Sequence, residues 1–164
     1  MIMILVLLLI LCLIIVYKRY QVQGNIKADR VKVIRNWNRN TVTWDEFFQL
    51  YDYTIKYDYE VLMRPPGFFI LNEGHLIEKV KKSLKKLNCT LGHAYASITN
   101  SAKSFDMHYD EENTFFWQCI GKTGWEVEGH GTYELGPGDL LVIPATIRHK
   151  VTALTPRMGI SMSV

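Results

Sequence analysis

Two histidines and one aspartate stand at a spacing that could hold a metal ion. His108 and Asp110 form an H-x-D pair, and His149 follows after a turn that contains proline. If the pair lies on a strand, its two side chains share one face while Tyr109 points away, because alternate residues of a strand face the same side. Two imidazoles and one carboxylate on one side of an ion are the ligand set of non-haem Fe(II) oxygenases. The pattern therefore predicts a catalytic iron site formed by these three residues.

The chain after Thr90 predicts a rigid frame of short strands for this site. Strands are expected near residues 91–99, 106–110, 114–120, 124–128, 131–135, 139–143, 149–154 and 158–163. Glycine and proline separate them, most clearly in Gly136-Pro137-Gly138-Asp139. Short, closely spaced strands of this kind indicate a mainly β fold of the jelly-roll class, a double-stranded β-helix with an interior that can hold a metal.

One or two helices are expected before the strands. Thr43 and Glu46 have the spacing of a capping box, which predicts a short helix through residues 45–53. After the break at Pro65-Pro66-Gly67, a second helix is expected over residues 74–88. Its apolar face consists of Leu76, Val80, Leu84 and Leu87. The lysines on its other faces are most simply explained as a solvated surface.

The first 17 residues are apolar and uncharged, and positive charges follow them, beginning at Lys18 and Arg19. A helix of this length spans about 26 Å, close to the thickness of a hydrocarbon core. The positive-inside rule would keep the rest of the chain in the cytosol. We therefore expect a transmembrane anchor in the lipid bilayer at 1–17 and a basic juxtamembrane linker at 18–40. One domain should follow at 41–164, with a helical lead-in at 41–89 and a β-barrel at 90–164.

The net charge of +3 is too small to argue for a nucleic-acid partner. The three cysteines do not form a disulfide framework and fit a reducing compartment. The expected protein is therefore a single-pass membrane protein whose domain lies in the cytosol, and no nucleic acid is expected to bind it.

Two segments around the histidines resemble a known family. "HYDEENTFFWQCIGKTGWEV" and "YELGPGDLLVIPATIRHKVTALTP" are together similar to the JmjC-type hydroxylases, which have the cupin fold. The resemblance covers roughly residues 90–164. The positions that match the first family motif are His108, Asp110, Phe115, Phe116, Gln118, Gly121, Lys122 and Trp125. Those that match the second motif are Pro137, Gly138, Asp139, Pro144 and His149.

This resemblance implies a dioxygenase that depends on Fe(II) and on 2-oxoglutarate as cosubstrate. The distal carboxylate of 2-oxoglutarate needs a cation. The relatives place Lys or Arg two residues after the motif glycine, where this chain has Thr123. Lys122 stands one residue early, on the opposite face of a regular strand. Arg157, on the last expected strand, is the other candidate, and we favour it over Lys122.

Three functional hypotheses remain open at this point. The first is a membrane-anchored dioxygenase that hydroxylates a protein side chain or a small molecule. The second is a non-catalytic cupin-like module, tethered to a membrane, that binds a partner or holds a metal structurally. The absence of a cation at Thr123 keeps this hypothesis open. The third is a cupin that uses the same metal pocket without 2-oxoglutarate.

Overall fold

The computed structural model describes residues 26–164. Within these residues, no helix is long and apolar enough to cross a membrane. The predicted location as a single-pass membrane protein is contradicted by this finding. The predicted anchor at residues 1–17 lies outside the described part of the chain.

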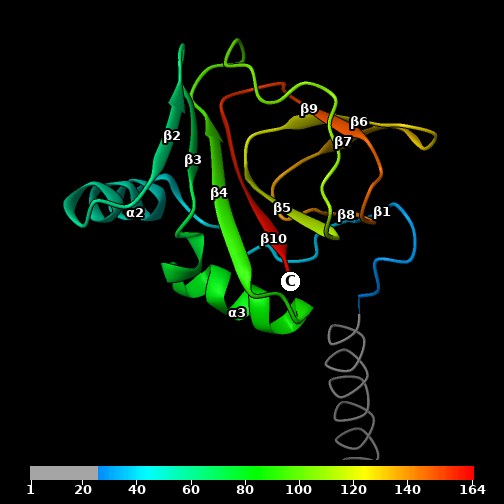
Figure 1. Cartoon of the computed structure of the whole chain (residues 1–164), viewed down its shortest axis with the longest axis horizontal. Helices are drawn as coiled ribbons and strands as arrows, with labels where there is room; N and C mark the ends of the chain where they lie inside the picture. Colours follow the sequence, from blue (N-terminus) through cyan, green and yellow to red (C-terminus); the bar gives the residue numbers. More distant parts are fainter. Residues whose placement is uncertain (1–25) are drawn as a thin grey trace, which may run out of the picture.

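The described residues form a mainly β structure with two sheets and two α-helices (Figure 1). The strands of the large sheet are β1 (Lys32–Ile34), β2 (Val61–Arg64), β3 (Phe68–Leu71), β4 (Leu91–Ser97), β5 (Thr114–Ile120), β8 (Leu140–Ile143) and β10 (Arg157–Ser163). Their spatial order is β1-β8-β5-β10-β4-β3-β2. The small sheet contains β6 (Thr123–Val127), β7 (Gly131–Leu135) and β9 (His149–Ala153), in the order β7-β6-β9. All neighbouring strands are antiparallel.

Side-chain alternation along the central strands separates two apolar layers. On β5, Phe115, Trp117 and Cys119 belong to the larger core cluster, whereas Phe116 packs in the cluster shared with the small sheet. The same division holds on β8, as expected where both faces of a sheet are covered. Arg157 lies next to Met158 along β10 and therefore faces the small sheet rather than the larger cluster.

The two helices cover the outer face of the large sheet. They are α2 (Trp44–Lys56) and α3 (Glu78–Leu87), and a 3-10 turn over Gly74–Leu76 precedes α3. The buried apolar side chains of both helices join the larger core cluster. The capping box is present as predicted: Thr43 Oγ1 accepts from the Glu46 backbone N–H at 3.2 Å, and the Glu46 carboxylate accepts from the Thr43 N–H at 2.9 Å.

The structure differs from the sequence-based expectation at three places. Residues 106–110 form a loop rather than a strand, and His108 makes an isolated bridge to His149. Residues 61–71, where the sequence indicates a break around the two prolines, form the β2–β3 hairpin. Residues 32–34, within the expected linker at 18–40, form β1 and pair with β8. Three residues are too few to show a periodicity, so only the partner strand makes this segment recognisable.

A candidate metal centre and its cavity

The structure brings His149 next to the His108–Asp110 pair, although His149 lies 39 residues after Asp110 in the sequence. One ligand-type atom from each residue lies within 4.8 Å of the other two. His149 is the first residue of β9, and the other two lie in the loop between β4 and β5. Two backbone hydrogen bonds join the segments: His108 N–H donates to the His149 carbonyl at 3.0 Å, and His149 N–H donates to the His108 carbonyl at 2.7 Å. This single bridge takes the place of the expected strand.

Both imidazoles are oriented by backbone carbonyls. Nδ1 of His108 lies 2.7 Å from the Asp106 carbonyl, and Nδ1 of His149 lies 3.0 Å from the Ile147 carbonyl. A carbonyl oxygen can only accept, so each Nδ1 carries a hydrogen, and Nε2 is the nitrogen that has the free lone pair when such a ring is neutral. Such hydrogen bonds commonly fix the tautomer and ring orientation of metal-binding histidines. The two rings are therefore prepared to present Nε2 to an ion.

The carboxylate of Asp110 is also held. Thr114 Oγ1 donates to Asp110 Oδ2 at 2.6 Å, and His149 Nε2 lies 3.6 Å from the same oxygen. Burial lowers the pKa of His149 below its ordinary value, and this outweighs the opposing effects of the Ile147 carbonyl and Asp110. A lowered pKa favours the neutral imidazole, which is the form that binds metals. The donor set of two imidazoles and one carboxylate fits Fe(II) and related divalent ions.

A cavity of about 40 Å³ adjoins the three candidate ligands. Its apolar wall includes Phe116, Trp125 and Val151, and its polar lining includes Tyr95 and Arg157. The ring of Phe116 passes over β10 at Gly159, where any Cβ atom would collide with it. The cavity therefore brings together an apolar side, a cationic residue and a candidate metal centre.

Arg157 is the most unusual residue of this cavity. It is fully buried (0% exposed), its Nε donates to Ser97 Oγ at 3.1 Å, and its guanidinium lies 5.8 Å from the Phe68 ring centre. Among the described residues, its Nη1 and Nη2 atoms have no hydrogen-bond partner. Burial lowers the pKa of Arg157 to about 10. A buried cation with two free donor groups is costly unless an anion joins it, and a carboxylate matches the guanidinium geometry.

The two alternative positions for the cosubstrate's cation lie elsewhere. Lys122 is exposed, and its Nζ forms an ion pair with Glu134 at 2.8 Å. Thr123 is fully buried and bonds to Gln118 and Trp125. Of the three candidates, Arg157 alone combines a positive charge with a place in the cavity lining.

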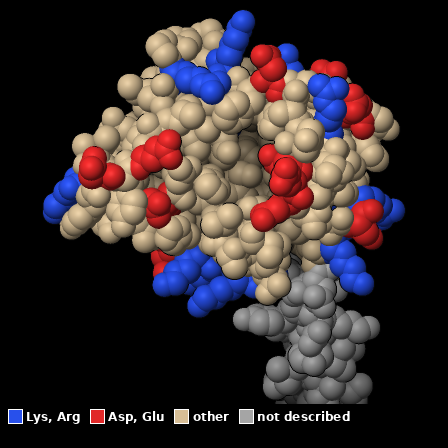
Figure 2. Space-filling model, in the orientation of Figure 1, with Lys and Arg blue, Asp and Glu red and all other residues tan. Residues whose placement is uncertain are grey.

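The cavity adjoins a wider depression of about 390 Å³ on the surface, and Tyr95, Asp110, Thr114 and Ser161 line both. The acidic residues along this depression are Asp110, Glu111 and Glu112. The face drawn in Figure 2 is hollowed near its centre, with acidic side chains beside the hollow. A substrate would therefore meet the candidate metal centre from an open, acidic side.

Sequence reasoning did not find the residues that support the candidate ligands. Ser97 faces Arg157 only because β4 pairs with β10 in the register Arg157–Ser97, and strand pairing is not encoded in a local pattern. The ring of Phe105 packs against Phe68, and its centre lies 5.4 Å from that of the His108 ring. These contacts hold the loop at residues 106–110, where a strand was expected. Thr114 was detectable in principle, since it follows closely after the H-x-D pair.

Comparisons with known proteins bear on the fold. No family model matches the sequence, and no curated protein matches it. Among solved structures, YcfD, a ribosomal oxygenase from Escherichia coli in complex with cobalt and succinic acid, superposes with a TM-score of 0.65 over 85% of this chain. The predicted resemblance is confirmed at the level of the fold. The sequence identity is 18%, and the match covers 49% of the YcfD chain, so this chain spans about half the length of that oxygenase.

A second structure of the same oxygenase contains cobalt and 2-oxoglutarate. It superposes with a TM-score of 0.65 and 18% identity, over 84% of this chain and 48% of its own. A cupin superfamily protein from Desulfitobacterium hafniense is less similar, with a TM-score of 0.47 and 11% identity over 63% of this chain and 82% of its own. The described residues thus share their mainly β architecture with about half of the YcfD chain.

Proposed function

We propose that this chain is an Fe(II)- and 2-oxoglutarate-dependent dioxygenase that hydroxylates a protein side chain or a small molecule. One observation carries the proposal: the free guanidinium edge of Arg157 lines the same cavity as His108, Asp110 and His149. A metal-binding triad alone would suit many cupins. A triad with a buried, unpaired arginine beside it suits a metal together with a dicarboxylate.

Each residue of the cavity has a distinct role in this proposal. His108, Asp110 and His149 would hold the iron, and Arg157 would bind the distal carboxylate of 2-oxoglutarate. Phe116, Trp125 and Val151, which form the apolar side of the cavity, would limit the access of water to the reacting atoms. When bound, the iron and 2-oxoglutarate supply oxidation of a C–H bond by O₂, with release of succinate and CO₂.

The same arginine weakens the case for a non-catalytic module. That hypothesis arose because Thr123 stands where the resembling hydroxylases have Lys or Arg. Arg157 provides a positive charge from β10 instead, on a strand of the other sheet. A binding-only cupin gives no reason for a buried guanidinium with two unbonded nitrogens next to a candidate metal centre.

The test is direct binding and turnover with the full chain. Protein loaded anaerobically with Fe(II) should, once exposed to O₂, convert 2-oxoglutarate to succinate, and the Co(II) form should bind 2-oxoglutarate without turnover. Arg157→Ala should keep the metal and weaken 2-oxoglutarate binding by roughly 10- to 100-fold, since hydrogen bonds to a charged partner are lost.

Two further variants sharpen this test. His108→Ala should lose metal binding, whereas Lys122→Ala, which removes an exposed cation, should bind 2-oxoglutarate like the wild type. If metal-loaded wild-type protein does not bind 2-oxoglutarate, the proposal is wrong. If Lys122→Ala shows the larger loss, Arg157 is not the carboxylate-binding residue.

A further inference from the structure

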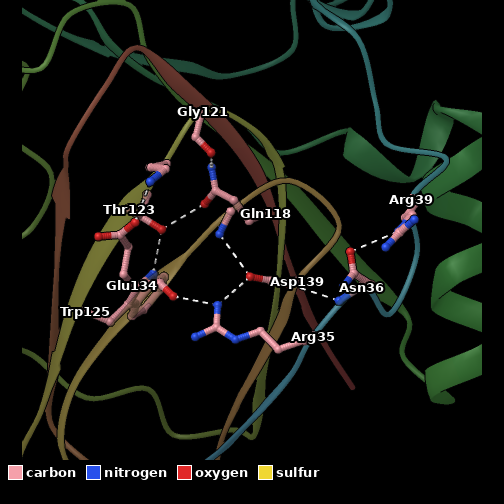
Figure 3. Close-up of polar contacts among 11 residues, drawn as sticks. Arg35, Asn36, Arg39, Gln118, Gly121, Thr123, Trp125, Glu134 and Asp139 are labelled. Carbon is pink, nitrogen blue, oxygen red and sulfur yellow. Dashed lines mark hydrogen bonds and ion pairs between the residues drawn. The ribbon is translucent and has the colours of Figure 1, made fainter.

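Trp125, which belongs to the apolar wall of the cavity, forms a chain of hydrogen bonds with two buried residues that do not line it, Thr123 and Gln118. Gln118 and Thr123 are fully buried (0% exposed) and Trp125 nearly so (4%). Gln118 lies on β5, and the other two lie on β6 of the small sheet. Figure 3 shows the chain as dashed lines that run from Gln118 through Thr123 to Trp125.

The direction of every bond in this chain can be deduced. Gln118 Nε2 donates to the carbonyl of Ile120 at 2.7 Å and also lies 3.3 Å from the carbonyl of Gly121. Its Oε1 therefore faces Thr123, whose hydroxyl donates to it at 2.9 Å. The Thr123 oxygen then accepts from Trp125 Nε1–H at 3.0 Å. An indole nitrogen can only donate, so the three bonds are consistent in one direction only.

The indole that this chain fixes lies against a candidate metal ligand. The ring centre of Trp125 is 4.7 Å from that of Phe116 and 5.7 Å from that of His149. The Ile147 carbonyl holds one edge of the imidazole, and the Trp125 ring packs beside it at an angle of 36°. We therefore expect the indole to restrict rotation of the imidazole about its bond to Cβ.

We propose that Gln118 and Thr123 are positioning residues that act through Trp125 on His149 and hold its Nε2 toward the metal. The orientation of His149 toward a metal rests on the proposed function. The hydrogen bonds among Gln118, Thr123 and Trp125 do not depend on that function. Thr123 thus has a role of its own at the position where the resembling hydroxylases carry a cation. Its hydroxyl is fully engaged by Gln118 and Trp125 and is not available to a cosubstrate.

Apolar packing alone would not select a threonine at this position. Valine has nearly the same shape and is equally suited to a strand, so a Thr123→Val substitution would fill the same volume. A buried hydroxyl is unfavourable unless it is bonded, and the Thr123 hydroxyl is bonded on both sides. The threonine is therefore best explained by the two hydrogen bonds that it makes.

The first experiment examines the hydrogen bond between Trp125 and Thr123 in the metal-free protein. In the ¹H–¹⁵N spectrum of the full-length protein, the Trp125 indole signal is assigned by its loss in Trp125→Phe. Thr123→Val should shift this signal and accelerate its hydrogen exchange. Thr123→Ser, which keeps a hydroxyl, should retain the protection, and so should the control Thr132→Val at an exposed position of β7. An indole that stays equally protected in Thr123→Val would overturn the hydrogen-bond chain.

The second experiment measures Co(II) binding through the visible absorption of the ion. Thr123→Val should raise the Co(II) dissociation constant about 10-fold, the lower end of the range for residues that support metal ligands, and should alter the absorption bands. Thr123→Ser should keep the dissociation constant and the absorption bands of the wild type. If Thr123→Val does not fold, Trp125→Phe takes its place, and the same direction is expected.

The outcomes separate this inference from the function proposed above. Equal Co(II) affinity and equal spectra in wild type and Thr123→Val would overturn the positioning role while leaving the metal centre intact. Failure of the wild type to bind Co(II) would overturn the proposed function and the metal-directed role together. In that case the hydrogen-exchange experiment on the Trp125 indole still decides whether the hydrogen bonds from Gln118 through Thr123 to Trp125 are formed.

Discussion

At the scale of single residues, Arg157 combines a cost in stability with a candidate role in binding. It is fully buried, it bonds through Nε to Ser97, and its remaining nitrogens are unpaired among the described residues. Replacing buried ionic groups by apolar residues of similar volume is often neutral or stabilising. Residues of this kind are retained where function requires them, even though stability would favour another side chain.

Arg157→Met should therefore stabilise the ligand-free protein, by about 1–4 kcal/mol in the free energy of unfolding, because the buried unpaired charge is removed. Urea denaturation without metal or 2-oxoglutarate measures this. Lys122→Met is the matched control: it removes an exposed ion pair and should change stability by less than about 1 kcal/mol. A clear destabilisation in Arg157→Met would mean that the guanidinium is already well satisfied in the ligand-free protein.

At the scale of elements, the turn before β8 attaches β1 to the large sheet. The Asp139 carboxylate accepts from the backbone N–H groups of Gly136 and Asn36, each at 3.0 Å, and from Arg35 Nη1 at 2.6 Å (Figure 3). Burial alone would raise the pKa of Asp139, but these hydrogen bonds outweigh it and lower the pKa below 3.8. The motif aspartate is therefore a structural residue that joins two turns distant in sequence.

Asp139→Asn should destabilise the protein at neutral pH by about 1–3 kcal/mol, because one carboxylate serves three donors. Since the pKa is lowered in the folded state, this stability is present above the ordinary aspartate pKa and is lost as the pH falls through the folded-state value. The difference between variant and wild type should thus shrink below about pH 3.8. Urea denaturation across this pH range measures it. The control Asp52→Asn, on the exposed side of α2, should show no such trend.

The elements also show how far the sequence could predict the structure. Strands such as 114–120 and 131–135 were predicted with their correct bounds because apolar patterning and glycine turns are local signals. The loop at 106–110 was mistaken for a strand because the expected metal geometry suggested one. The β2–β3 hairpin was missed because two prolines obscured its turn. The bond from Arg157 to Ser97 depends on register between strands distant in sequence, which no local pattern specifies.

At the scale of the whole molecule, the candidate metal centre lies where the small sheet meets the loop between β4 and β5. His149 belongs to the small sheet, whereas His108 and Asp110 belong to the loop that connects two strands of the large sheet. Among the described residues, one isolated bridge pairs that loop with the small sheet. A bound ion would link the two parts, with two bonds to the loop and one to the small sheet.

Co(II) should therefore raise the free energy of unfolding of the whole chain, by about 2.7 kcal/mol at a free concentration 100 times the dissociation constant. Thermal denaturation with and without the ion measures this. In His108→Ala, Co(II) should not raise the free energy of unfolding. In the control His130→Ala, in the exposed turn between β6 and β7, Co(II) should raise it as much as in the wild type. An equal gain in His108→Ala would place the ion somewhere else.

The position of β10 constrains the order in which the chain can fold during synthesis. β10 follows all the other described strands in the sequence, yet it lies between β4 and β5 in the middle of the large sheet. A nascent chain that has not yet passed Ser163 lacks the strand that joins the two halves of this sheet. Long-range pairing of this kind delays closure and leaves strand edges exposed until it is complete. Because Arg157 is the first residue of β10, the cavity gains its buried cation in the same step that closes the sheet.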